Sequence, residues 1–76
     1  MYHHIEFRLK GLAELESPGR SNLEQLMIQQ GTRLHAEIKP YVAETNRGPV
    51  EVADLYLEDG SVARAVRYAT FSFVEE

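Results

Sequence analysis

Cysteine is absent from the 76-residue sequence. This excludes disulfides, thiolate metal sites and thiol catalysis. A domain of this size buries only about 60% of the surface that its unfolded chain exposes, so its core alone gives marginal stability. Further support must therefore come from a regular sheet, a metal or a partner subunit.

Positive charge is scarce. Eight lysines and arginines stand against twelve aspartates and glutamates, for a formal net charge of -4. Nucleic-acid binding is disfavoured because it depends on cations that neutralise phosphates. No apolar run approaches the roughly 18 residues of a membrane helix, and the N-terminus lacks a basic region followed by an apolar one. We therefore expect a cytoplasmic protein without a membrane partner.

Hydrophobic residues make up 43% of the sequence, and the first of them follow a period of two. Apolar and charged side chains alternate from Ile5 to Leu15. The pattern predicts a half-buried strand over residues 2–15, with a bulge or bend at Gly11. The alternative is a shorter strand followed by a helical turn over residues 12–16.

Residues 17–20, Ser-Pro-Gly-Arg, break this alternation. Ser21 and Glu24 then have the spacing of a capping box, in which each side chain binds a free amide of the other residue. Apolar residues follow at helical spacing, and Gly31 stands where helices commonly end. The sequence therefore predicts one short helix over residues 21–30.

Three more strands are predicted after the helix. The first has about twelve residues and includes the alternation from Leu34 to Val42. Pro40 cannot donate to a ladder, which places it at an edge or at a bulge. The turn cluster Asn46-Arg47-Gly48-Pro49 separates this strand from the next, over residues 50–58, and the last strand covers residues 62–74.

Asp59-Gly60 is the strongest local signal. Asp-Gly between apolar runs predicts a two-residue hairpin turn with positive φ at both residues. In the following strand Phe71 and Phe73 are expected in the core. Some apolar residues have the opposite parity, so we expect a bulge that changes the buried face midway. These residues are Val62, Val66 and Tyr68.

The predicted fold is a single α+β domain over residues 1–76, with one short helix and a mostly antiparallel four-stranded sheet in the order strand, helix, three-strand meander. Strands of this length span about 40 Å, whereas the helix is only about 14 Å long. The helix cannot cover the apolar face of the sheet. Either the sheet curls into a small barrel, or its open face packs on a second copy. We therefore expect a homo-oligomer, most simply a dimer.

This order of elements and the final segment Phe71-Ser72-Phe73-Val74 resemble those of dodecins, small oligomeric flavin-storage proteins. The helix over residues 21–30 is much shorter than theirs, and a strand is added. No flavin-binding residue is therefore assigned, and no family is identified.

Histidines and glutamates form the first candidate site. His4 shares a strand face with Glu6, as His35 does with Glu37, and His3 points to the other face. If the two strands were neighbours, these side chains would gather as divalent-metal ligands do. No metal motif occurs, and a solvated polar face is the favoured interpretation, so we assign neither a metal nor a cofactor.

Acidic residues form the second candidate cluster: Glu51, Asp54, Glu58 and Asp59. Paired carboxylates can perform acid–base chemistry. The hairpin turn explains Asp59, and Glu58 flanks it. Asp54 lies on an alternating face as an inward-pointing charge, which is a known device against edge pairing, so a structural role is favoured.

Arg64, Arg67 and Tyr68 form the third candidate site, in a stretch that contains no acid over residues 61–74. Such a strand can hold a small ligand, an anion or a nucleic-acid base, although pairing with carboxylates of a neighbouring strand is the favoured alternative. No catalytic motif is found. We therefore expect a non-catalytic interaction module that self-associates and is open to a protein partner. The alternative function is a binding module that uses these three residues.

Overall fold

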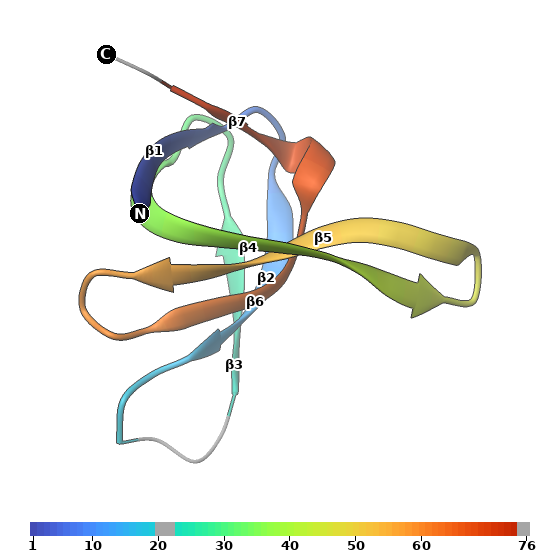
Figure 1. Cartoon of the computed structure of the whole chain (residues 1–76), viewed down its shortest axis with the longest axis horizontal. Helices are drawn as coiled ribbons and strands as arrows, with labels where there is room; N and C mark the ends of the chain where they lie inside the picture. Colours follow the sequence, from blue (N-terminus) through green and yellow to red (C-terminus); the bar gives the residue numbers. More distant parts are fainter. Residues whose placement is uncertain (20–22, 75–76) are drawn as a thin grey trace.

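The computed structural model describes residues 1–19 and 23–74. Seven strands form one antiparallel sheet in the order β3-β2-β6-β5-β4-β1-β7. The sheet curls on itself as a half-barrel (Figure 1). The predicted α+β class with four strands is therefore wrong. On sequence grounds, either curling of the sheet or packing on a second copy is expected to cover the apolar face. Curling is observed (Figure 1).

The strands follow one another closely along the chain. A 3₁₀ turn, Tyr68–Thr70, connects the last two strands. The strands are β1 (Tyr2–Phe7), β2 (Gly11–Glu16), β3 (Glu24–Ile28), β4 (Arg33–Thr45), β5 (Gly48–Leu57), β6 (Val62–Arg67) and β7 (Phe71–Phe73).

The helix predicted over residues 21–30 is wrong in its described part, because β3 lies there and pairs with β2. In this register Leu12 faces Met27 and Ala13 faces Leu26. The capping-box residue Ser21 lies outside the described residues. Over so short a segment the apolar residues of β3 fit the period of a helix as well as that of a strand. Pairing with the neighbouring strand β2 therefore overrides the local preference for a helix.

The first predicted strand is two strands. β1 ends at Phe7 and pairs with β4 and β7, whereas β2 pairs with β3 and β6. The corner falls at residues 8–10 rather than at Gly11, and the alternative of a helical turn over residues 12–16 is also wrong. The amide groups of Arg8 and Leu9 both donate to the carbonyl of Thr70, at 2.8 and 3.3 Å. These bonds satisfy the backbone where the chain leaves one pairing for another.

The strand predicted around residues 34–42 is confirmed as β4, which forms a hairpin with β5. Thr45 pairs with Gly48, so Asn46 and Arg47 make the predicted turn. Pro40 faces Ala53 of β5, whereas the pairing of β4 with β1 stops at Glu37. Pro40 thus lies where β4 is an edge, as its missing N–H requires.

The hairpin at Asp59-Gly60 is confirmed, but its turn is longer than predicted. The Leu57 amide donates to the Ser61 carbonyl at 2.8 Å, which leaves three residues in the loop. Within the described chain Gly60 has a φ of 92°, and no positive φ is found at Asp59. Asp59 instead accepts a hydrogen bond from the Ser61 amide at 2.8 Å. This is the three-residue loop in which only the last residue is left-handed.

The single strand predicted over residues 62–74 is wrong, because a 3₁₀ turn divides it into β6 and β7. A bulge is present, but it lies between Val62 and Val66 rather than between Tyr68 and Phe71, where the predicted change of face falls.

The register of β5 and β6 shifts between Ala53 and Leu55, so that Arg64 and Ala65 together oppose Asp54. This is a β-bulge, and Ala65 has a φ of 56°. Beyond the bulge, Phe71 is buried as predicted, whereas Phe73 is 39% exposed and its core assignment is wrong.

The core lies within the curl. Its largest fully buried side chains are Phe7, Ile5 and Leu55, and four alanines are buried with them. The cluster comprises Ile5, Phe7, Ala13, Ile28, Ala36, Ala53, Leu55, Ala63, Val66 and Phe71. In residues 1–19 and 23–74 no helix has the length and apolar character needed to cross a membrane.

Candidate functional site

Asp54 is the centre of a polar cluster on the β-bulge. Its Oδ1 accepts the Ala65 amide at 3.0 Å and the Tyr41 hydroxyl at 3.1 Å. Its Oδ2 accepts Nη1 of Arg64 at 2.9 Å, and the carboxylate side chain is only 14% exposed. Because β5 is the middle strand of the sheet, Asp54 does not protect an edge, and that interpretation is wrong. The carboxylate instead holds the bulge together.

Arg64 is paired on both sides. Its Nε donates to Oε2 of Glu16 on β2 at 3.0 Å, while Nη1 reaches Asp54 on β5. The hydrogen bond to Glu16, and then that to Asp54, raises the pKa of the Arg64 guanidinium. Partial burial, together with the bond to Asp54, raises the pKa of Tyr41. The sequence offered two roles for Arg64, ligand binding or pairing with carboxylates of a neighbouring strand. The structure shows the pairing.

The structure does not bring Arg64, Arg67 and Tyr68 into one site. Arg67 is exposed, and its side chain forms no ion pair with a described residue. Tyr68 is half-buried and packs on Phe71 and Phe73, with ring centroids 5.3 and 6.5 Å apart. Each of the three side chains therefore has different surroundings.

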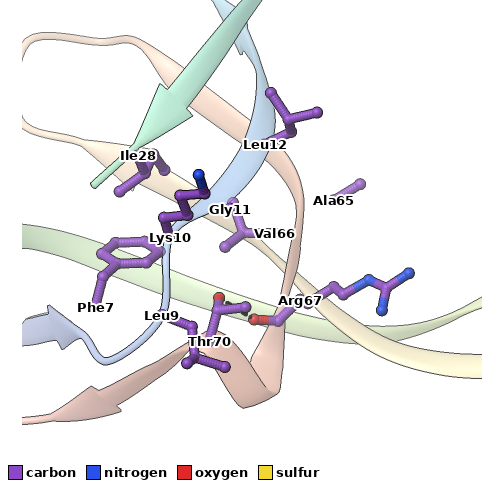
Figure 2. Close-up of a pocket in the computed structure, with 10 residues that line it drawn as sticks. All are labelled: Phe7, Leu9, Lys10, Gly11, Leu12, Ile28, Ala65, Val66, Arg67 and Thr70. Carbon is purple, nitrogen blue, oxygen red and sulfur yellow. Dashed lines mark hydrogen bonds between the residues drawn. The ribbon is translucent and has the colours of Figure 1, made fainter. Parts of the chain in front are cut away.

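A groove opens where β2 and β6 part. These strands pair only between Glu14↔Arg64 and Glu16↔Val62. The space beyond this pairing has a volume of about 490 Å³, and Figure 2 shows the side chains around it. Its lining residues are Phe7, Leu9, Lys10, Gly11, Leu12, Ile28, Ala65, Val66, Arg67 and Thr70.

The floor of this groove is apolar and its charges are all positive. Phe7, Ile28 and Val66 are at least 95% buried, being 1%, 5% and 2% exposed. Lys10, in the loop between β1 and β2, and Arg67, at the end of β6, lie on different sides of the groove, and the guanidinium of Arg67 extends outward, away from Lys10 (Figure 2). None of the described residues that line the groove is an acid. Its chemistry suits a ligand with an apolar body and a negative group.

The histidines come together, but the glutamates do not join them. His4 faces His35 across β1 and β4, and the two rings stack with centroids 4.3 Å apart. His35 hydrogen-bonds the carboxylate of Glu58 in the next hairpin. Glu6 accepts Nε of Arg33 at 2.7 Å. Within the described residues no group of three potential metal-binding side chains is found.

Glu37, the glutamate that shares a strand face with His35, forms an ion pair with Lys39. Nζ of Lys39 lies 2.8 Å from Oε1 of Glu37 and lowers the pKa of that carboxyl, mainly by its hydrogen bond. The two strands are neighbours, as a metal site would require, yet the two histidines and the two glutamates do not gather around one point. Cations on the same sheet face compete for the carboxylates.

The acidic residues predicted as a cluster are dispersed by the hairpin. The Ser61 amide binds the carboxylate of Asp59 and lowers its pKa. Glu58 bonds His35, and Glu51 is exposed on β5. With Asp54 occupied at the bulge, no pair of these carboxylates shares a hydrogen bond or a common partner in the described structure.

The terminal strand β3 is a candidate interface that the sequence did not indicate, because a helix was predicted there. Among the described strands β3 pairs only with β2, so it is a terminal strand of the sheet. Leu26 and Met27 are 41% and 45% exposed on this strand, and Leu12 of β2, opposite Met27, is 61% exposed. Leu23, just before β3, is 50% exposed. An edge with this composition favours association.

Lys10 is the other residue that sequence reasoning missed, because it was placed within a strand. Its position across the groove from Arg67 depends on the corner at residues 8–10 and on the bulge of β6.

Comparison with protein-family models, curated proteins and solved structures finds no match to this chain.

Proposed function

We propose that the protein is a non-catalytic interaction module that forms a homodimer by pairing the β3 strands of two copies. The observation that carries this proposal is the contrast between two edges of the same sheet. Residues 38–45 of β4, which pair only with β5, include Lys39, Pro40 and Glu44. Charges and proline on an edge oppose strand addition. β3 contains neither lysine nor proline, and its single charged residue, Glu24, lies at its first position.

The sequence of β3 is compatible with pairing to itself. An antiparallel pair that includes all five residues places Leu26 opposite Leu26 of the second copy. Glu24 then faces Ile28 of the second copy, so the two Glu24 carboxylates lie at opposite ends of the pair. Such an interface has two-fold symmetry, buries part of the Leu26 side chain of each copy and leaves no like charges opposite each other.

Light scattering after size-exclusion chromatography tests this proposal. The wild-type protein should have twice the 8.7 kDa mass of one chain at tens of micromolar. Leu26→Lys puts two like charges opposite each other and should give a monomer. Val42→Lys is the matched control, since Val42 is 59% exposed on the projecting part of β4. It should remain dimeric.

Charge exchange separates the interface from a folding defect. Leu26→Glu alone should also be monomeric, whereas an equimolar mixture of Leu26→Lys and Leu26→Glu should recover the dimer mass, because opposite charges then meet. A wild-type protein that stays monomeric would contradict the proposal. So would a dimer that both single variants leave intact.

A further inference from the structure

We propose that the groove between β2 and β6 binds a small organic anion with an apolar chain, whose carboxylate is bound by Lys10, with Arg67 as a second cation at the outer rim. Of the residues that line this site only Ile28 belongs to β3, and ligand binding does not depend on dimer formation. The argument uses the charges of the groove, its shape and the cause of its opening.

The described lining of the groove contains two cations and no acid. Acids outnumber bases by twelve to eight in the sequence, and carboxylates hold several cations on the sheet. Arg33, Lys39 and Arg64 are paired in this way. Lys10 and Arg67 form no ion pair within the described chain, although they line one groove. Two unpaired cations beside an apolar floor are complementary to an amphipathic anion.

The shape of the groove matches such a ligand. A volume of about 490 Å³ lies within the range of small-molecule sites, roughly 300–1,000 Å³. Gly11 contributes to this space because it has no side chain. A Cβ at Gly11 would meet only Cγ2 of Thr70, at 3.8 Å, so a larger residue can enter the groove without a clash at its first atom.

The groove opens because of a strained feature that Asp54 maintains. Ala65 lines the groove, and its backbone has a positive φ, which residues other than glycine rarely adopt. Its amide is held by Asp54. Backbone strain of this kind often accompanies ligand sites. The same bulge places Arg67 on the outer face rather than toward the core.

Isothermal titration calorimetry of the full chain with decanoate tests the proposal. Decanol is the uncharged control ligand with the same number of carbon atoms. Decanoate should bind the wild-type protein and decanol should bind at least tenfold more weakly. Lys10→Gln and Arg67→Gln should each weaken decanoate binding by about tenfold or more, as expected for the loss of one charged hydrogen bond, and should leave decanol binding unchanged. Gly11→Leu should weaken both ligands because it fills the groove.

Arg47→Gln is the matched control, because it removes the same charge from the exposed turn between β4 and β5. Its affinity for decanoate should equal that of the wild-type protein. Circular dichroism should show the same sheet signal for all variants. The proposal is overturned if the wild-type protein does not bind decanoate, if Arg47→Gln weakens binding as much as Arg67→Gln, or if Gly11→Leu has no effect. Leu26→Lys should bind decanoate normally, so failure of the dimer and failure of this site are distinguishable.

Discussion

Arg64 and Arg67 lie three residues apart on β6 and have opposite surroundings. Arg64 donates to carboxylates on both neighbouring strands. Arg67 forms no ion pair within the described residues and borders the groove. The sequence treats them as equivalent cations of one strand. Their difference shows that the neighbouring strands, rather than the residue type, decide whether an arginine is structural or available to a ligand.

The bulge between the two arginines causes the difference. Ala63 and Val66 are both buried, although a regular strand would point them to opposite faces. The extra residue, Ala65, restores Val66 to the core and turns Arg67 outward. It also ends the pairing of β6 with β2, since the register stops at Glu14↔Arg64. One inserted residue therefore ends the paired region and opens the groove.

Asp54→Ala should have the largest effect, because it removes the acceptor that the Ala65 amide, Arg64 and Tyr41 share. Loss of hydrogen bonds to a mostly buried carboxylate should lower the free energy of unfolding by about 2–4 kcal/mol. A domain of this size has only roughly 4–11 kcal/mol in total. The melting temperature should fall by at least about 10 °C in a calorimeter.

Glu51→Ala is the control for this variant, because Glu51 is exposed on the same strand. It should melt within about 2 °C of the wild-type protein, as most surface substitutions do. If Asp54→Ala were equally harmless, the carboxylate would not hold the bulge, and the contrast between Arg64 and Arg67 would need another cause.

Gly60→Val should have the next largest effect and tests the register of β5 and β6 on which the bulge depends. At a φ of 92° a β-branched residue is strained by about 1–2 kcal/mol. Its Cβ would also approach Cγ of Pro18 to 3.1 Å. The melting temperature should fall by several degrees, at about 4–8 °C per kcal/mol.

Gly19→Val is the comparison for Gly60→Val. Gly19 also has a positive φ, of 79°, but a Cβ there would meet nothing within 4 Å. This variant should therefore melt between the wild-type protein and Gly60→Val. Equal melting of Gly60→Val and the wild-type protein would mean that the hairpin is misplaced.

The smallest effect is expected from the two arginines themselves, and it tests the comparison directly. Arg64→Ala leaves Asp54 without its cation and should lower the melting temperature by a few degrees, since partly exposed ion pairs contribute little. Arg67→Ala removes no described ion pair and should melt like the wild-type protein. Differential scanning calorimetry of both variants in one buffer measures the two melting temperatures. Equal losses would show that Arg67 also has a structural role.

Short-range chemistry determined the features that the sequence predicted correctly. The turns at Asn46-Arg47 and Asp59-Gly60 depend on adjacent residues, and the edge position of Pro40 depends on its missing N–H. Alternation correctly placed Ile5 and Phe7 in the core. The change of parity along residues 62–74 predicted a bulge in this segment, because apolar side chains must remain on the buried face, but it did not give the position of the bulge.

Only the tertiary structure decided the remaining features. Over five residues the apolar pattern of β3 fits a helix or a strand, and pairing with β2 selects the strand. The break of the first predicted strand reflects separate partners for β1 and β2, and a carbonyl distant in sequence, that of Thr70, stabilises the corner. The groove is created where β2 and β6 separate. Hydrogen bonds between distant strands have no signal in local sequence, so the terminal position of β3 and the groove could not be predicted from it.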